Sequence, residues 1–359
     1  MTGTARRPKA HSAKNQGRAT IGDIAAAAGV SKMTVSRVMS SPWSVRPDTR
    51  ERVMKVAEAM HYTPNRSARV LSGAQQIRLG LLYNMPRSSY IVDLLMGAMD
   101  QASLMDIQLV SRPVELGGNA LTTLQGMVDN GVDGVILTPP LCDAPDILAY
   151  VATIDLPVLL IGTDAANMAV STISIDEAAA AREMTEYLIR RGHRRIAFIK
   201  GEPVLAASHI RVNGFAQAMA AHGLPVPEAY VAQGFYTYRS GLDAAEALLR
   251  LDPRPTAIFA SNDDMAAAAI TVAHRLGLEV PRDVSIVGFD DSWIATSIYP
   301  ELTTIRQPIR ELATDGIQTM ARVVRALREG EATTHRLVAP YTLIVRQSDA
   351  PYPSAAPSA

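Results

Sequence analysis

The chain has 359 residues, of which 48% are hydrophobic and 19% are charged. This length exceeds a single typical domain, and the composition excludes an intrinsically disordered protein. The one cysteine, Cys142, excludes an internal disulfide framework and is typical of a reducing compartment. The sequence has neither a run of about 18 apolar residues nor the apolar core of a secretion signal, so we expect no membrane span and a cytoplasmic location.

The formal net charge is zero, but the charges are unevenly distributed along the chain. Residues 1–73 contain 13 Lys and Arg against 4 Asp and Glu, whereas the remainder contains 22 against 31. Residues 1–73, the head, therefore carry a formal charge of +9, and the remaining residues, the body, carry −9. A basic head predicts a polyanionic partner. We expect residues 1–18 to form a disordered basic tail, which accounts for only part of this charge.

Residues 19–64 predict a small all-helical domain. The first helix opens with Thr20 and Asp23 in a capping pattern, and it ends at Gly29, which suits the left-handed turn after a helix. The third helix begins near Pro47, because proline is favoured in a first helical turn. Two helices joined by a tight, glycine-containing turn indicate a helix-turn-helix domain.

The second helix of this domain has an unusual outer face. Ser31 can cap the helix, and Val35, Val38 and Met39 form one apolar stripe at helical spacing. The opposite face combines two cations, a hydroxyl and a thioether, which belong to Lys32, Met33, Ser36 and Arg37. The two cations could simply belong to an ordinary solvated face, and Met33 could simply occupy a core position. Because Met33 lies off the apolar stripe, the pattern favours an outward role for it.

From Leu79 onward, β-branched apolar strands alternate with helical segments. This alternation is typical of parallel sheets covered by helices on both faces, and its length favours two lobes over one sheet. Between head and body, residues 65–74 predict a short hinge helix bounded by a proline and a glycine. We expect a two-lobed α/β domain over 75–346, to which the resemblance described below assigns effector binding and dimerisation, and a disordered tail over 347–359.

The sequence lacks the motifs that mark common classes of enzyme. It has no phosphate-binding loop, no nucleophile elbow and no metal-spaced His/Cys cluster, so it disfavours an enzyme and predicts neither a cofactor nor a metal site. Adjacent Asp290 and Asp291 suit an acid–base pair poorly, and Asp291 is better explained as a helix cap or surface charge. We expect His193 and the basic run 190–195 to form a solvated helix end. A transport-associated sugar-binding protein would need export and would lack the helix-turn-helix.

Four segments, "ATIGDIAAAAGVSKMTVSRVMSS", "TRERVMKVAEAMHYTPNRSARVLSG", "GFDD" and "LTTIRQP", resemble the lactose/galactose-repressor family of bacterial transcription regulators. The resemblance runs from Thr20 to Arg346. It implies a periplasmic-binding-protein-like effector domain and a ligand-responsive regulator, expected to repress carbohydrate-utilisation genes. It further implies a homodimer on a palindromic double-stranded DNA operator and a sugar or sugar acid as effector. Whether the effector releases or promotes DNA binding stays open.

By this resemblance, the second helix is a recognition helix in the DNA major groove. Arg37 can donate two hydrogen bonds to a guanine, and Met33 offers apolar contact to a thymine methyl. The implied base-contacting residues are Lys32, Met33, Ser36 and Arg37, and the implied phosphate-contacting residues are Ser31, Thr34 and Thr49. Phosphate contacts fix the register without reading sequence. Many relatives have Ser or Thr where this chain has Arg46, so a side-chain cap of the third helix is lost here.

The resemblance also implies a DNA contact from the hinge. In this family, two hinge helices of a dimer fold together in the minor groove, and a leucine from each wedges between base pairs. Leu71 matches the wedge, and Asn65 and Ala68 match residues that face the groove. The alternative for Leu71 is a linker leucine that covers the lobe beneath it.

The expected effector site is the cleft between the lobes, at the carboxyl ends of the parallel strands. Arg211 matches an arginine that grips ligand oxygens, and Asp290 matches a carboxylate that accepts from hydroxyls. Tyr236 is expected to stack on the ligand, with Phe235 and Tyr238 as competitors. The remaining candidates are Asn262, Asn84, Ser89, Tyr90 and Asp164, the last as a substitute for an aspartate that the family has directly after a strand. A structural ion pair with Glu202 or Asp290 is the alternative role for Arg211.

Overall fold

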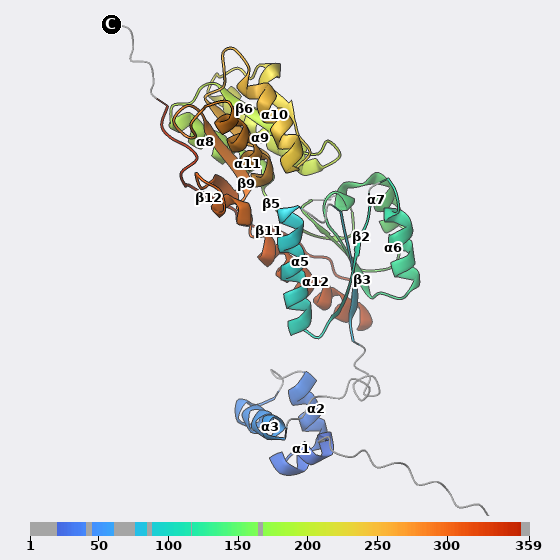
Figure 1. Cartoon of the computed structure of the whole chain (residues 1–359). Helices are drawn as coiled ribbons and strands as arrows, with labels where there is room; N and C mark the ends of the chain where they lie inside the picture. The colour runs from blue at the N-terminus through green and yellow to red at the C-terminus, as the bar shows by residue number, and fades with distance from the viewer. Residues whose placement is uncertain are drawn as a thin grey trace, which may run out of the picture. The chain divides into compact units, whose positions relative to one another are not determined.

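The computed structural model describes residues 20–40, 45–60, 76–84, 88–115, 117–163 and 168–352. The chain divides into two compact units, one ending at Gln76 and the other beginning at Ile77 (Figure 1). The predicted basic tail and hinge helix lie outside the described residues. Of the helices described, none combines the length and apolarity needed to cross a bilayer.

The first unit is the predicted trio of helices, α1 (Ile21–Ala28), α2 (Lys32–Ser40) and α3 (Pro47–Ala59). Its core is formed by fully buried Ile24, Val35, Val38 and Val53, which confirms the apolar stripe of α2 at Val35 and Val38. The side chain of Met39 lies outside the description. The apolar faces of three short helices, none stable alone, are thus buried against one another.

The predicted caps of this unit are present. Thr20 and Asp23 form a capping box, in which the Asp23 amide donates to Thr20 Oγ1 at 3.3 Å and the Thr20 amide donates to Asp23 Oδ2 at 2.8 Å. Gly29 follows α1 with φ of +63°, the left-handed conformation that glycine adopts without steric cost. Arg46 gives α3 no side-chain cap, as expected.

The second unit consists of two lobes, and the N-terminal lobe contains a six-stranded parallel sheet in the order β11-β5-β4-β3-β1-β2. Helices α5 and α12 cover one face of the sheet, and α6 and α7 cover the other (Figure 1). A Cβ at Gly97 would lie 2.6 Å from the Arg310 carbonyl, so glycine allows α5 to pack closely on α12. The elements are β1 (Arg78–Tyr83), α5 (Ser89–Leu104), β2 (Gln108–Pro113), α6 (Ala120–Asp129), β3 (Gly134–Leu137), the 3-10 turn η2 (Leu141–Asp143), α7 (Pro145–Val151), β4 (Val158–Ile161), β5 (Ser171–Ile175), α12 (Ile309–Arg328) and β11 (Arg336–Ala339).

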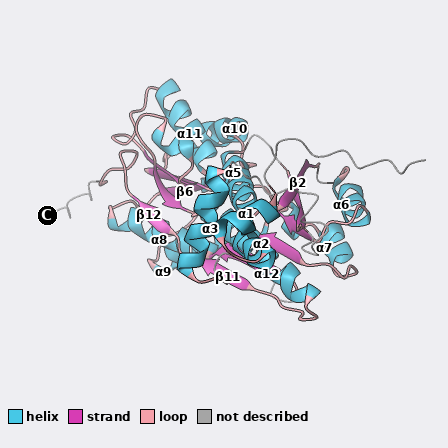
Figure 2. Cartoon of the chain, turned by 90° about the horizontal axis from the view of Figure 1, so that it is seen from below, coloured by secondary structure: helices cyan, strands magenta, loops and turns pink. Residues whose placement is uncertain are grey.

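The C-terminal lobe has a second six-stranded sheet in the order β12-β10-β9-β8-β6-β7, parallel except for β12. Figure 2 shows α10 and α11 on one side of this sheet and α8 and α9 on the other. Its core includes the stacked pair Phe198 and Phe215, both fully buried. The elements are α8 (Glu177–Arg190), β6 (Ile196–Lys200), α9 (Ala206–Ala221), the 3-10 turn η3 (Glu228–Tyr230), β7 (Val231–Gln233), α10 (Tyr238–Leu249), β8 (Ala257–Ala260), α11 (Asp263–Arg275), β9 (Ser285–Asp290), the 3-10 turn η4 (Trp293–Thr296), β10 (Thr303–Arg306) and β12 (Thr342–Ile344).

The chain passes between the lobes three times. It leaves the N-terminal lobe after β5, returns between β10 and α12, and leaves again between β11 and β12. The two-lobed α/β architecture with parallel sheets is therefore as predicted. Connections of this kind let two rigid lobes shift relative to each other by small backbone changes at a few residues.

The predictions for residues 347–352 and for His193 are wrong, and the rest of the predicted tail, 353–359, lies outside the described residues. Residues 347–352, expected to begin a disordered tail, run along the C-terminal lobe, where Ser348 is fully buried and buried Asp349 accepts from Thr303 Oγ1 at 2.6 Å. His193, expected at a solvated helix end, is only 2% exposed. Its ring nitrogens contact Thr256 Oγ1 at 3.0 Å and the Ala350 carbonyl at 3.1 Å. The imidazole is buried because this C-terminal segment covers it.

Candidate functional site

The outer face of α2 is presented as the sequence predicts. Lys32, Met33 and Arg37 are exposed, and Met33 exposes 68% of its surface although methionine is usually buried. Thr34 and Ser36 are half-buried. An exposed thioether between two cations is unusual for a solvated face and is suited to an interface.

Hydroxyl groups hold the start of α2 in place. The Thr34 amide donates to Ser31 Oγ at 3.1 Å, and the two side-chain hydroxyls lie 2.9 Å apart, so Ser31 caps the helix. The Lys32 side chain lies beside α1, where a Cβ at Gly22 would be 3.3 Å from its Cε atom. Thr49 is half-buried in the first turn of α3. The predicted hinge contacts Asn65, Ala68 and Leu71 lie outside the described residues.

A pocket opens between the two lobes of the second unit, with a cavity volume of about 60 Å³. Residues of both lobes line it: Ser88, Tyr90, Ile91 and Pro139 from the N-terminal lobe, and Leu205, Ala207, Arg211, Tyr236, Asn262 and Asp290 from the C-terminal lobe. The lining is mostly apolar with a few convergent polar groups, which is typical of a small-molecule site. Of the eight predicted effector residues, five therefore meet here.

Arg211 lies at the centre of the polar groups of the pocket. Its Nε donates to Glu177 Oε2 at 2.7 Å, its Nη2 donates to Glu177 Oε1 at 3.1 Å, and its Nη1 donates to the Ser261 carbonyl. Its guanidinium carbon also lies 3.7 Å from the centroid of the Phe289 ring. Burial alone would lower the pKa of Arg211, but the charges of Glu177 and Asp290 raise it, so the side chain stays cationic.

Asp290 is the second charged group that faces the pocket. Its Oδ1 accepts from Gln307 Nε2 at 2.7 Å and lies 3.9 Å from Arg211 Nη1. Burial raises the pKa of Asp290 well above its ordinary value, although Arg211 opposes the shift. Its φ of +114° is one that non-glycine residues rarely adopt, and such backbone conformations cluster at ligand sites.

Tyr236 and Asn262 complete the wall from the C-terminal lobe. The Tyr236 ring lies directly on the backbone of Gly201, where a Cβ would come within 2.0 Å of its Cζ atom. Burial raises the pKa of Tyr236 to about 12, so its hydroxyl remains protonated and can donate. Asn262 Nδ2 donates to the Tyr236 carbonyl at 3.0 Å, and its Oδ1 caps α11 by accepting from the Met265 amide at 3.0 Å. Both competitors, Phe235 and Tyr238, are exposed and do not line the pocket.

The predicted residues of the N-terminal lobe divide into three groups. Tyr90 lines the pocket. Asn84 instead donates from Nδ2 to the Val114 carbonyl at 2.8 Å, and Ser89 donates to Asp264 Oδ1 of the other lobe at 3.3 Å. Asp164 lies outside the described residues. Asn84 and Ser89 thus have structural contacts where direct ligand contacts were expected.

Two carboxylates, here called the crossing carboxylates, each accept a hydrogen bond from the first turn of a helix in the opposite lobe. Asp143 Oδ2 accepts from the Ala206 amide of α9 at 3.1 Å, and Asp264 accepts from the Ser89 hydroxyl at 3.3 Å and from the Ser89 amide at the start of α5. Neither Ser88 nor Leu205, the N-cap residues of these helices, provides a side-chain cap of its own. Burial raises the pKa of both Asp143 and Asp264, and the hydrogen bonds from the facing lobe lower it. The lobes therefore cap each other's helices beside the pocket.

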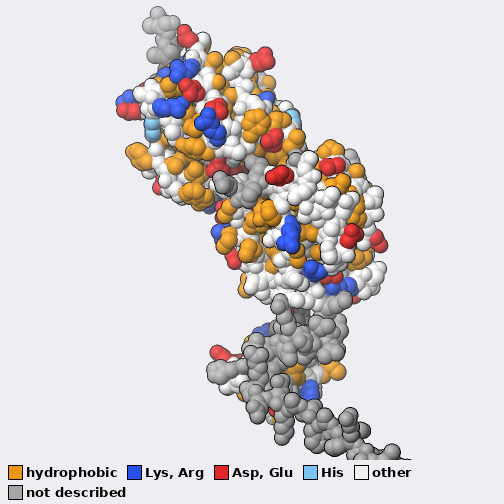
Figure 3. Space-filling view, turned by 45° about the vertical axis from the view of Figure 1, so that its right-hand side comes forward, with side chains coloured by type: hydrophobic (Ala, Val, Ile, Leu, Met, Phe, Trp, Pro, Cys, Tyr) orange, Lys and Arg blue, Asp and Glu red, His pale blue; other side chains and the backbone are white. Residues whose placement is uncertain are grey.

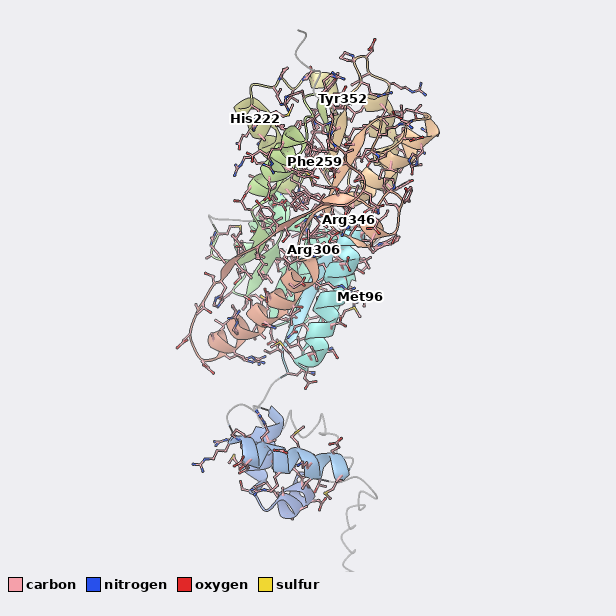
Figure 4. The ribbon with its side chains drawn as sticks, turned by 90° about the vertical axis from the view of Figure 1, so that its left-hand side faces the viewer. Met96, His222, Phe259, Arg306, Arg346 and Tyr352 are labelled. Atoms are coloured by element: carbon pink, nitrogen blue, oxygen red, sulfur yellow. The ribbon has the colours of Figure 1, made fainter. Side chains whose placement is uncertain are left out.

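Glu177, Gln307 and the two crossing carboxylates were missed in the sequence. Glu177 is the first residue of α8 and Gln307 follows β10, so both lie where the chain passes between lobes. Gln307 lies in the quoted segment "LTTIRQP", but no local pattern assigned a role to any of these residues, because their partners are distant in the chain. Asp291, expected as a cap or surface charge, instead pairs with Arg306 at 2.6 Å and with Arg346 at 2.6 Å. Figure 4 labels these two arginines. The alternative role of Arg211 as a structural ion pair is present with Asp290, at 3.9 Å, while its shorter pair, at 2.7 Å, is with Glu177, which the sequence did not suggest.

These two units define a class of protein: a helix-turn-helix domain joined to a two-lobed, ligand-binding α/β domain. Comparisons agree. Residues 20–65 match the family "Bacterial regulatory proteins, lacI family", and residues 185–348 match the "Periplasmic binding protein-like domain". The chain belongs to the lacI family and is a helix-turn-helix transcriptional regulator.

Relatives match over nearly their whole length. Catabolite control protein A of Priestia megaterium is 32% identical over 92% of this chain and 98% of its own length. A lac repressor dimer bound to operator and an anti-inducer has a TM-score of 0.70 at 27% identity, covering 93% of this chain and all of that one. The regulator CelR in complex with cellobiose has a TM-score of 0.67 at 31% identity, covering 92% of this chain and all of that one.

Proposed function

We propose that the chain represses transcription by binding a palindromic operator as a homodimer, and that a small molecule in the interlobe pocket changes its operator affinity. The observation that carries this proposal is the pocket itself, in which Arg211 and Asp290 converge beside Tyr236 and Tyr90. The solved relatives that hold operator DNA or cellobiose support the same combination.

The proposed base-reading residues are Lys32, Met33, Ser36 and Arg37. Their helix presents its polar face while Val35 and Val38 anchor the other, so the side chains can enter a major groove without disturbing the core. Ser31, Thr34 and Thr49 are proposed to hold phosphates, and Asn65, Ala68 and Leu71 to contact the minor groove. Phosphate contacts give affinity, and base contacts give sequence preference.

The effector signal is proposed to pass through the connections between the lobes. Ligand hydroxyls would bind Asp290 and Asn262, and the ring of Tyr236 would cover an apolar face of the ligand. Asp290 is held by Gln307 at the second connection, and Arg211 is held by Glu177 at the first. A ligand that alters these contacts changes the balance between lobe arrangements, which is the requirement for allosteric coupling.

The dimer is proposed to use the outer face of α5. Val92, Met96, Met99 and Leu104 expose 43%, 41%, 55% and 82% of their surfaces, and Figure 4 shows Met96 directed outward. Hydrophobic side chains also reach the surface elsewhere on the lobes, where they are interspersed with charged ones (Figure 3). A row of exposed apolar residues on one helix is typical of a protein–protein interface.

The test is selection of bound duplexes from a random DNA pool by the full chain, followed by fluorescence anisotropy on the enriched sequence. We expect enrichment of one palindrome and a Kd that responds to a sugar. Arg37→Ala should abolish the sequence preference, whereas Arg52→Ala, the same charge change on exposed α3, should retain it. Equal affinity for the palindrome and for a scrambled duplex would contradict the proposal.

A further inference from the structure

Glu177 forms an ion pair with Arg211, the cation in the described lining of the pocket. It is 7% exposed, and both of its oxygens accept hydrogen bonds from Arg211, at 2.7 and 3.1 Å. This bidentate pair occupies the edge of the guanidinium formed by Nε and Nη2, and Nη1 donates to the Ser261 carbonyl. Arg211 therefore reaches the pocket with its charge already compensated.

The other titratable groups close to Arg211 and Glu177 are acids. Asp290 lies 3.9 Å from Arg211, which Glu177 has already neutralised, and Asp263 stands close enough to Asp290 to add a repulsive interaction. Asp263 is itself fully buried and accepts from Thr304 Oγ1 at 2.6 Å and from the Ser292 amide at 2.8 Å. The charges of Arg211 and Glu177 cancel, and Asp290 adds no positive charge in either protonation state, so the described lining holds no uncompensated cation. Among the described residues that line the pocket, Arg211 is the only cation.

An acidic ligand would meet two costs in this setting. Its carboxylate or phosphate would lose hydration in a mostly apolar pocket, and it would face Asp290 without a free cation. An uncharged ring meets neither cost, because its hydroxyls can donate to Asp290 and accept from Tyr90 or Tyr236, whose hydroxyls stay protonated. Its apolar face can lie against Tyr236, Leu205 and Ile91.

Resting on the proposed function of this pocket, we propose that the effector is an uncharged, hydroxyl-bearing ring and that Glu177 is the residue that excludes acidic ligands. The sequence alone left a sugar and a sugar acid open. Two sources share the proposed chemistry, a neutral saccharide and a nucleoside, and the experiment separates them.

The experiment is isothermal titration calorimetry of the full chain with matched neutral and acidic compounds. The saccharide arm compares glucose with glucuronate, galactose with galacturonate, and adds cellobiose. The nucleoside arm compares cytidine and adenosine with their 5′-monophosphates. We expect a neutral compound of one arm to bind at least about tenfold more tightly than its acidic counterpart, the size of one unfavourable charge contact.

Variants of α8 assign the effect to Glu177. Glu177→Gln removes the compensating charge and should reduce the preference for the neutral compound by about tenfold, whereas Glu177→Asp should keep it. Glu186→Gln is the matched control, because Glu186 lies on the same helix, 3.8 Å from Arg190 at the surface. If Glu177→Gln fails to fold, the comparison of matched compounds on the unaltered chain still decides the point.

Two results would overturn the inference. One is an acidic compound that binds the unaltered chain as tightly as its neutral counterpart, and the other is no binding by any neutral compound of either arm. Operator binding, measured on the same preparation, separates this failure from that of the proposed function. A chain that selects its palindrome but binds no neutral ring refutes only the ligand class.

Discussion

The two carboxylates that cross between the lobes give the most specific prediction of this structure. Asp143 caps α9 and Asp264 caps α5, each from the opposite lobe. Replacing an N-cap acceptor by alanine costs about 1 kcal/mol, which is about fivefold in an equilibrium. Because a shift of the lobes breaks both contacts together, Asp143→Ala and Asp264→Ala should each increase the population of separated lobes about fivefold, and the double variant about 25-fold.

Amide hydrogen exchange measures this without any ligand. Asp143→Ala should speed exchange in the first turn of α9, beginning at Ala206, and also in the first turn of α5, although Asp143 does not contact α5. Asp264→Ala should give the reciprocal result. Asp146→Ala, an exposed acid in the first turn of α7, is the control and should change neither helix. Faster exchange confined to the helix that lost its own cap would refute the argument that the two contacts report one movement of the lobes.

Three further predictions concern the DNA-binding side chains and the buried histidine. Arg37→Ala should weaken specific operator binding by about 2 kcal/mol per half-site, about a thousandfold for a dimer, while weak and salt-sensitive association persists; unchanged anisotropy titrations on the palindrome would contradict this. Leu71→Ala should reduce DNA bending in circular-permutation gel shifts, and an unaltered bend angle would count against a wedge. Burial lowers the pKa of His193, so the unfolded chain binds the additional proton and the free energy of unfolding should fall below pH 6.5 by up to about 1.4 kcal/mol per pH unit. His193→Asn should flatten that dependence in urea titrations, and an unchanged slope would exclude His193 as its source.

The sequence predicted those features that depend on local periodicity. The stripe of Val35 and Val38 and the cap at Thr20 need only neighbours within one or two turns, and the strand–helix alternation needs only segment lengths. The meeting of Arg211 with Asp290 was also predicted, because residues at the carboxyl ends of parallel strands and at nearby helix starts converge at one edge of a sheet.

The features that the sequence did not predict depend on contacts distant in the chain. The sequence around His193 is typical of a basic helix end. The imidazole is buried because the segment around Ala350, 157 residues further along the chain, covers it. Glu177 is one of several acids around a helix start, and its role comes from Arg211, 34 residues away. Asp143 and Asp264 resemble ordinary surface acids until the lobes are brought together. Long-range placement, not residue type, decides what each of these charges does.

The energies of these contacts are of the size that regulation requires. Allosteric coupling between two sites is typically about 1–3 kcal/mol, and two interlobe caps at about 1 kcal/mol each lie within that range. The pocket network joins the same movement, since Arg211 is held at one connection by Glu177 and Asp290 at another by Gln307. Under the proposed function, a ligand that donates to Asp290 Oδ1 would compete with Gln307 and would thereby couple ligand binding to the arrangement of the lobes. Weak contacts at the boundary of the lobes, and not the strong cores within them, are therefore where a small molecule can alter this protein.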